Sequence, residues 1–259
     1  MSRIRQLDRR TFLTEVGLGA LAVVVIGAGT AACGGEPETS SPGSTVVPGG
    51  KSDASLPPTS GVVPETLSYR RVNLGFVSAY LLTRGTDVAI VDTGVEGSSG
   101  GIGDALSAAG RSWGDVRHLI LTHHHPDHIG SLAEVAEMAG GAAIYAGAPD
   151  VPSIKAPREV RPVNDGDEVF GLRMVASPGH TLGHVAVLDV ASSVLIVGDA
   201  LVNTPELSGS PPQYTVDAAQ ARESVRKLAA LDARTVLFGH GDPLEGNAAA
   251  ALKALAASL

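Results

Sequence analysis

One short run carries most of the chemical information in this chain of 259 residues, namely Thr122-His123-His124-His125-Pro126-Asp127-His128. It follows the apolar segment His118–Leu121 directly, and that segment predicts a β-strand. A loop leaving a strand can point side chains at positions i and i+2 in one direction, because residues at that spacing share a face. The next Asp and His can then face a second point close by. Imidazole and carboxylate groups bind zinc, iron or manganese, so the run predicts a metal site.

Three further groups of His and Asp residues follow later in the chain, each directly after a predicted apolar strand. They are Ser177-Pro178-Gly179-His180-Thr181-Leu182-Gly183-His184, Gly198-Asp199 and Gly239-His240. Folds of the α/β class usually build their sites from loops at strand ends, above a rigid sheet. The first run therefore does not stand alone, and these groups are candidates for the same site.

From Thr66 onward, short β-rich runs are joined by Gly and Asp turns and interrupted by helical patterns. We predict a hairpin-like turn over Thr83–Asp87 and helices over Gly101–Ala109, Ser131–Met138, Val216–Leu231 (begun by Thr215) and Asn247–Leu259. We predict strands over Tyr69–Val72, Val77–Leu82, Val88–Val91, His118–Leu121, Ala143–Ala146, Val169–Ala176, Ala186–Asp189, Val194–Val197 and Thr235–Phe238.

Taken together and in this order, the four His/Asp elements resemble the metallo-β-lactamase fold superfamily over residues 66–259. The Thr-His-x-His-x-Asp-His and Ser-Pro-Gly-His-Thr-x-Gly-His strings are most similar to its hydroxyacylglutathione hydrolase (glyoxalase II-like) branch. The resemblance implies an α/β fold of the αββα type, a four-layer sandwich in which two mixed β-sheets are flanked by helices. It also implies that the metals lie at one edge of the paired sheets.

The same resemblance implies a ligand set for two divalent metal ions, with zinc expected first and iron or manganese as alternatives. Asp127 is also the candidate catalytic residue, because a carboxylate there could orient the proton of the nucleophile. The implied ligands are His123, His125 and His180 for the first ion, Asp127, His128 and His240 for the second, and Asp199 bridging both.

Five other residues of these motifs are not assigned as ligands. His184 is expected to support a ligand rather than to bind metal, and Thr122 and Asp92 are expected beside the site. For Asp92 a simple turn-forming role is equally open. His124 points away from its neighbours by strand alternation, and His118 is expected to be partly exposed.

Such a site predicts a hydrolase in which a metal-bound hydroxide attacks an ester, lactone or thioester carbonyl of a small-molecule substrate. No Gly-x-Ser-x-Gly run supports a serine nucleophile.

The alternative enzyme is a persulfide dioxygenase with one iron on His123, His180 and Asp199. A β-lactamase is less expected, because true metallo-β-lactamases typically lack an aspartate at the position of Asp199. A non-catalytic metal-binding lipoprotein is the remaining alternative. Glutathione thioesters are not expected substrates, because Lys253 is the one basic residue after His240.

Residues 1–32 are predicted to be an export signal of the twin-arginine type. The run Asp8-Arg9-Arg10-Thr11-Phe12-Leu13 resembles that signal, and an uncharged stretch from Val16 to Ala32 follows. Thr30-Ala31-Ala32-Cys33 resembles a lipobox, with Thr30 where Leu is usual, so Cys33 is the predicted lipidation site. Residues 33–64 are predicted to form a flexible tether and residues 65–259 the catalytic domain. We therefore expect the protein on the extracytoplasmic face of the membrane, held by a lipid anchor, with secretion or an uncleaved anchor as alternatives.

Charge and cysteine content narrow the range of functions. With 19 Lys and Arg against 27 Asp and Glu, the formal net charge is -8, which leaves no electrostatic footprint for nucleic acid. Cys33 is the single cysteine, so no disulfide can form within the chain. We expect the loops Asn203–Tyr214 and Leu74–Val77 to wall the substrate pocket. The sequence indicates no oligomeric state.

Overall fold

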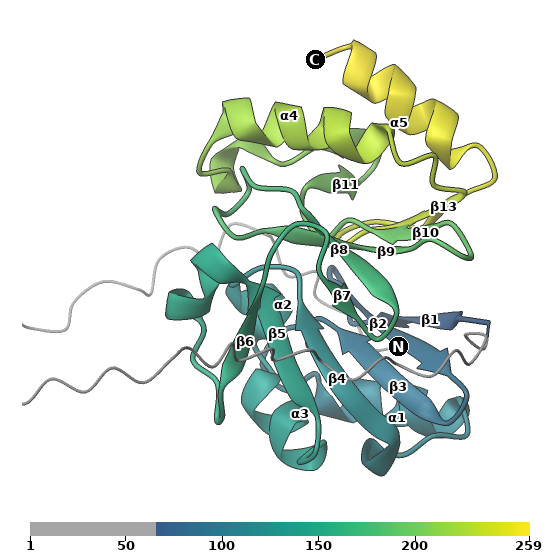
Figure 1. Ribbon diagram of the computed structural model, residues 1–259, viewed down its shortest axis with the longest axis vertical. Coiled ribbons are helices and arrows are strands. Elements are labelled where there is room, and N and C mark those ends of the chain that lie inside the picture. The colour runs from purple at the N-terminus through teal and green to yellow at the C-terminus, as the bar shows by residue number, and fades with distance from the viewer. Residues whose placement is uncertain (1–65) are drawn as a thin grey trace, which may run out of the picture. The chain divides into compact units, whose positions relative to one another are not determined.

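Two β-sheets pack face to face between two layers of helices in the computed structural model, which describes residues 66–259 (Figure 1). The predicted export signal, Cys33 and the tether lie outside the described residues. Within residues 66–259, none of the helices combines the length and the apolar character that crossing a bilayer requires.

The first sheet contains six strands in the order in which the chain supplies them. β1 to β3 pair antiparallel, whereas β3 to β6 pair parallel, so the sheet is mixed. Helices α1 (Ser99–Ala108), α2 (Pro126–Ile129) and α3 (Leu132–Met138) belong to this half of the molecule, as do the short 3-10 helices η1 (Trp113–Asp115) and η2 (Ala148–Ser153). The strands are β1 (Ser68–Asn73), β2 (Ser78–Arg84), β3 (Asp87–Val91), β4 (Val116–Leu121), β5 (Ala143–Gly147) and β6 (Val160–Val163).

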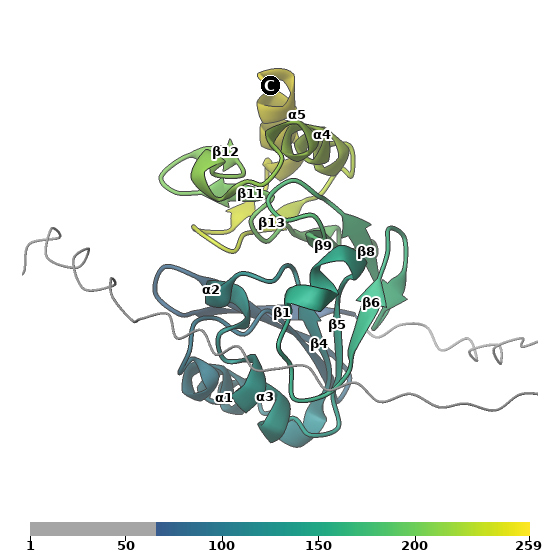
Figure 2. The same cartoon turned by 90° about the vertical axis from the view of Figure 1, so that its left-hand side faces the viewer.

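The second sheet also contains six strands, in the order β14-β13-β10-β9-β8-β7. It is mixed as well, because β10 and β13 pair parallel and the other neighbours antiparallel. A separate ribbon of β11 (Leu201–Asn203) and β12 (Leu207–Gly209) lies beside α4 (Ala218–Ala229) and α5 (Ala248–Ala257), as Figure 2 shows, and η3 (Pro212–Tyr214) follows it. The strands are β7 (Glu168–Val169), β8 (Leu172–Ala176), β9 (Val185–Asp189), β10 (Val194–Ile196), β13 (Thr235–Leu237) and β14 (Leu244–Glu245).

Strand alternation divides the apolar residues into three buried clusters and so produces four layers. In β3, Val88 and Ile90 face α1 and α3, whereas Ala89 and Val91 face the second sheet. In the second sheet, Met174 faces the first sheet and Val175 faces the α4–α5 layer. Because both faces of each sheet are covered, central strands such as β3 and β9 are buried on both sides. The expected αββα sandwich with two mixed sheets is confirmed.

Two of the predicted elements differ in detail from the structure. The run Val169–Ala176, predicted as one strand, is two strands, because Phe170 and Gly171 adopt positive φ values (59° and 69°) and form a turn between β7 and β8. The helix predicted over Val216–Leu231 begins later, at Ala218. Its N-cap is Asp217, whose side chain accepts hydrogen bonds from the amides of Ala219 and Gln220.

Candidate metal centre

The residues of the predicted metal site come from four loops that meet at one edge of the two sheets. The loop after β4 runs into α2, the second loop joins β8 to β9, and the other two follow the neighbouring parallel strands β10 and β13. The Val185 amide donates to the carbonyl of Thr122 at 2.9 Å, and the Gly239 amide donates to that of Gly198 at 3.1 Å. These backbone bonds join the loops in two pairs, the first with the second and the third with the fourth.

The loop after β4 changes direction at a proline. His125 keeps an extended backbone (φ -69°, ψ 148°), and Pro126 is the first residue of α2. Proline suits the first turn of a helix, because its fixed φ is helical and the amide it lacks would have no partner there. The turn redirects the side chains that follow it, so that His123 and His125 share one group and Asp127 and His128 share another. His123 and His128 also form a third group with Asp199.

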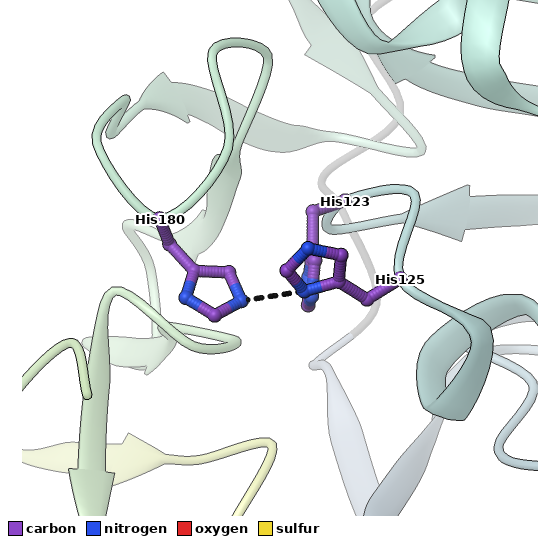
Figure 3. A group of neighbouring side chains, drawn as sticks. All are labelled: His123, His125 and His180. Carbon is purple, nitrogen blue, oxygen red and sulfur yellow. Dashed lines mark hydrogen bonds between the residues drawn. The ribbon is translucent and has the colours of Figure 1, made fainter. Parts of the chain in front are cut away.

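His123, His125 and His180 form the first group, in which one nitrogen from each ring lies within 4.8 Å of the others. Figure 3 shows the three rings converging from two sides of the site. His180 Nε2 and His125 Nδ1 are 2.9 Å apart. His123 is fully buried and His180 nearly so.

Asp127, His128 and His240 form the second group. His240 Nε2 lies 3.2 Å from Asp127 Oδ2, and His128 Nε2 lies 3.7 Å from the same oxygen. Asp199 lies between the two groups. Its Oδ1 is 3.2 Å from His128 Nε2, and its Oδ2 is 3.2 Å from His240 Nε2 and 3.6 Å from His180 Nε2. All seven predicted ligand side chains are therefore brought together.

The donor set fits metal ions by two criteria. First, the buried atom His123 Nε2 has no hydrogen-bond partner among the described residues, and the buried atoms His128 Nε2 and Asp199 Oδ1 face each other at 3.2 Å without a well-aligned hydrogen bond, although buried polar atoms are normally paired. Second, a tetrahedral zinc with bonds of roughly 2.0–2.1 Å holds its ligand atoms about 3.3 Å apart. The separations quoted above, from 2.9 Å to 3.7 Å, bracket that value.

Asp92 orients one of these imidazoles. It has a positive φ of 60° at the end of β3, and its Oδ2 lies 2.9 Å from His128 Nδ1. The same carboxylate accepts hydrogen bonds from the Thr122 amide and hydroxyl, each at 2.8 Å. A carboxylate that accepts the Nδ1 proton leaves Nε2 free to face a metal.

Two further imidazoles are oriented by groups that no sequence motif indicated. His180 Nδ1 lies 2.9 Å from Ser210 Oγ, and His240 Nδ1 lies 2.7 Å from the carbonyl of Phe76. Ser210 is thirty residues beyond its partner in the sequence, and Phe76 acts through its backbone. Neither contact leaves a local sequence signal, so sequence reasoning could not have found them.

The remaining predicted residues lie as follows. His184 accepts a hydrogen bond from the Asp199 amide at 3.1 Å through Nε2, and its Nδ1 lies 2.8 Å from Ser177 Oγ. Thr122 Oγ1 lies 3.1 Å from His123 Nδ1. His124 Nδ1 lies 3.0 Å from Asp150 and outside the three ligand groups. His118 is partly buried against the rings of Tyr145 and Phe170.

The electrostatics of the site favour cations. Burial holds the pKa of His123 well below its ordinary value and lowers the pKa of His180 to about 4. Burial would also lower the pKa of His128, but the carboxylates of Asp199 and Asp92 outweigh it and raise this pKa well above its ordinary value, so without a bound cation the proton on this imidazole balances the charge that a metal ion would otherwise balance. For Asp199 itself, the nearby His128 outweighs burial and lowers the pKa well below its usual range. An ionised carboxylate among imidazoles is a setting in which divalent cations bind.

A pocket of about 770 Å³ opens over this centre. His125, His180 and His240 line its floor together with the two ligand carboxylates. Phe76 comes from the predicted wall Leu74–Val77, and Thr204, Pro211 and Tyr214 come from the predicted wall Asn203–Tyr214. The third wall was not predicted and consists of Val95, Glu96, Pro126 and Gly130.

Residues 72–240 match the sequence profile described as the Metallo-beta-lactamase superfamily. This stretch is more than half of the chain and contains every predicted ligand. Among solved structures, a metallo-beta-lactamase family protein from Thermus thermophilus superposes with a TM-score of 0.59 at 26% identity, covering 74% of this chain and 77% of that one.

Two curated relatives are similar over shorter stretches. A hydroxyacylglutathione hydrolase from Rhodospirillum rubrum is 37% identical over 145 residues, which is 54% of this chain and 54% of that protein. A hydroxyacylglutathione hydrolase from Acidiphilium cryptum is 33% identical over 168 residues, which is 62% of this chain and 63% of that protein. The chain thus spans less than two thirds of the length of these relatives.

Proposed function

The chain belongs to the metallo-β-lactamase superfamily, and from this premise we propose that it is a dinuclear metal-dependent hydrolase acting on an ester, lactone or thioester carbonyl. One observation carries the proposal. Three buried ligand atoms, His123 Nε2, His128 Nε2 and Asp199 Oδ1, lack a well-aligned hydrogen bond among the described residues, and Asp199 lines an open pocket. A buried polar atom left without a partner costs free energy, and a bound cation would offset that cost.

In this proposal His123, His125 and His180 would hold the first cation, Asp127, His128 and His240 would hold the second, and Asp199 would serve both groups. The mixed nitrogen and oxygen donors suit zinc, with iron or manganese as alternatives. When bound, such a pair of cations would polarise a carbonyl oxygen, which makes the carbonyl carbon more electrophilic, and would lower the pKa of a water molecule, which makes that water a better nucleophile.

Asp127 is the protein's own candidate for moving a proton. Burial would raise the pKa of its carboxyl group, but the hydrogen bond with His240 and the charge of His128 outweigh burial and lower it. The carboxylate is therefore ionised at neutral pH, and its side chain is 29% exposed at the pocket surface. Asp127 would thus be available to accept the proton of the attacking water, whereas the more deeply buried Asp199 would contribute to both groups of ligands.

We infer the substrate class from the chemistry of the site and from the names of the two relatives described above. Both curated relatives are hydroxyacylglutathione hydrolases, which supports a thioester carbonyl. Esters and lactones present the same electrophilic carbon to the same site. The pocket of about 770 Å³ is of a size that takes a small molecule.

Turnover and metal content test this proposal together. Metal content is measured on the protein as purified, and the zinc-loaded protein is then assayed against thioesters, lactones, β-lactams and phosphodiesters, with His125→Ala as the variant that removes one ligand. We expect hydrolysis of a carbonyl substrate, two zinc ions per chain, and a loss of activity of at least about a hundred-fold in the variant. Activity that survives His125→Ala contradicts the mechanism. One iron per chain with oxygen consumption on a persulfide indicates the dioxygenase instead, and full metal content without turnover indicates a non-catalytic role.

We also propose that the protein is exported by a twin-arginine signal and anchored by a lipid on Cys33, which places the hydrolase outside the cytoplasm. The support comes from the sequence, namely Arg9-Arg10, the uncharged stretch that follows, and small residues before the cysteine. Mass spectrometry of the mature N-terminus tests it. Diacylated Cys33 in the membrane fraction is expected, together with loss of the anchor in Cys33→Ser, whereas an unmodified N-terminus in the medium indicates secretion.

A further inference from the structure

The pocket over the metal centre is unusual in its charge. Among the described residues that line it, none is Lys or Arg. Apart from the predicted metal ligands, its one charged residue is Glu96, which is exposed to solvent. The pocket is also lined by Phe76 and Tyr214, which are 65% and 63% exposed and therefore free to contact a ligand. A substrate that reaches from the floor to these walls meets apolar surface, aromatic faces and a single negative charge.

Glu96 lies on a segment whose backbone is fixed. We call Gly94–Glu96 the strap. The Gly130 amide donates to the carbonyl of Gly94 at 2.7 Å, and Ser131 Oγ donates to the carbonyl of Val95 at 2.6 Å. A Cβ atom on Gly130 would lie 2.4 Å from the Glu96 amide nitrogen, so only glycine permits this close approach. The start of α3 therefore holds the strap against the pocket.

The aromatic wall is also held in place. The ring of Phe76 stacks on that of His240, with centroids 5.9 Å apart and an interplanar angle of 3°, and the carbonyl of Phe76 lies 2.7 Å from His240 Nδ1. Aromatic faces attract cations through their quadrupole, and a carboxylate attracts them through its charge. Both walls therefore favour the same sign of charge on the part of a substrate that extends away from the reacting carbonyl.

We propose that this pocket selects substrates by charge and that Glu96 is the specificity-determining residue. The pocket accepts acyl compounds whose remote group is either cationic or neutral and apolar, and it disfavours compounds whose remote group is anionic. The proposal rests on the hydrolase function proposed above and names the substrate class within it. A glutathione thioester, which carries carboxylates, falls on the disfavoured side.

The test uses three acetyl thioesters that differ only in the end group of the leaving thiol, which is trimethylammonium, tert-butyl or carboxylate. kcat/KM is measured for the metal-loaded wild type, Glu96→Gln and Glu96→Lys. The matched control is Glu137→Gln, since Glu137 is an exposed glutamate on α3 that does not line the pocket. We expect the wild-type order cation, neutral, anion. Removing the charge should lower the cation-to-neutral ratio about three- to ten-fold, the range for unit charges roughly 6 Å apart at an effective dielectric constant between about 40 and 80.

In Glu96→Lys, kcat/KM should be higher for the anionic thioester than for the cationic one, whereas Glu137→Gln should leave the order unchanged. High salt should reduce the differences in kcat/KM that the wild type shows. A second measurement separates this inference from the hydrolase proposal. Thioether analogues with the same three end groups cannot be hydrolysed, and their dissociation constants are measured by calorimetry. If no thioester is turned over but the thioethers keep the charge order, the hydrolase proposal fails and the charge selection stands. If the order is the same in wild type and both Glu96 variants, the charge selection is wrong.

Discussion

At the scale of single residues, Asp92 shows how one carboxylate organises several parts of the site. It joins the end of β3 to the loop after β4, because it accepts hydrogen bonds from the Thr122 amide and hydroxyl and also faces His128 Nδ1. The position requires a positive φ, which Asp and Asn tolerate better than most residues. An asparagine there would keep the backbone conformation but remove the charge.

We therefore predict that Asp92→Asn lowers metal affinity while the fold is retained. Loss of a carboxylate that orients a ligating imidazole typically costs about 10–100-fold in affinity. Competition with a chromophoric chelator measures this change, and circular dichroism confirms folding. Asp104→Asn is the control, because Asp104 is an exposed residue of α1. Equal affinities in wild type and Asp92→Asn would show that His128 does not depend on this carboxylate for its orientation.

The predicted ligands could be read from the sequence because they stand in short strings whose types and spacing are specific to metal chemistry. His123, His125, Asp127 and His128 occur within six positions. The groups that lie within hydrogen-bond distance of Nδ1 of His180 and His240 could not be predicted in this way. Ser210 is an ordinary serine in a Pro-rich loop, and the Phe76 carbonyl belongs to the backbone, so only the folded chain reveals their contacts with His180 and His240.

At the scale of elements, a polar tie connects the segment before the His180 loop to the helix layer. Asp165 Oδ1 accepts hydrogen bonds from Lys227 Nζ on α4 at 2.6 Å and from the Ala176 amide at 2.9 Å. The same ammonium group donates to the carbonyl of Ala176 at 2.8 Å. Ala176 ends β8 and directly precedes the Ser177–His184 loop. The tie therefore fixes where that loop begins.

This tie predicts a pH-dependent contribution to stability. The hydrogen bond from Lys227 is the main cause that lowers the pKa of Asp165, with burial opposing it and the Ala176 amide adding to it. Because the folded pKa lies below the unfolded value, the contribution is fully present above the unfolded pKa of about 4 and is lost as pH falls through the lowered folded value. Asp165→Asn should destabilise by about 0.5–1 kcal/mol at neutral pH, since the pair is partly exposed.

Urea unfolding of wild type and variant as a function of pH measures this difference, which should vanish in acid. A Lys227→Gln background serves as the control, because the effect of Asp165→Asn should shrink once its partner is gone. A difference that stays constant down to pH values below the lowered pKa would mean that the effect arises from packing and not from the charge.

Most elements could be predicted because periodicity and β-propensity agree with the tertiary arrangement. β3, β5 and α1 lie within two residues of their predicted bounds. The turn at Phe170–Gly171 was missed because a bulky residue with positive φ is not a typical turn signal. The β11–β12 ribbon was missed because Thr204, Pro205 and Glu206 between its strands give the region the composition of a loop. In both cases long-range packing outweighs local preference.

At the scale of the whole described domain, the predicted ligands come from both sheets. The loop after β4 of the first sheet supplies His123, His125, Asp127 and His128, and the second sheet supplies the other three. Several direct polar links also join the two sheets near the site. Tyr80 Oη donates to the carbonyl of Phe238 at 2.7 Å, and the Ser78 amide donates to that of Gly239 at 2.9 Å. Burial raises the pKa of Tyr80 to about 12, so this hydroxyl keeps its proton at neutral pH.

Bound cations would therefore join the two sheets as well as serve catalysis, and their removal should loosen the contact between them. Free zinc at about a thousand times its dissociation constant stabilises a protein by about 4 kcal/mol. For a domain of this size, that corresponds to a loss of about 8–16 °C in Tm on chelation. Hydrogen exchange should show where the structure loosens. The amides of Val185, Gly239 and Ser78 bridge the loops at the sheet edge and should exchange faster after chelation. The exchange rates of amides in α1 and α4 should change less. Asp199→Asn removes the shared ligand and should abolish most of the chelator effect. An unchanged Tm, or an increase in exchange spread evenly over both helix layers, would show that the ions do not hold the sheets together.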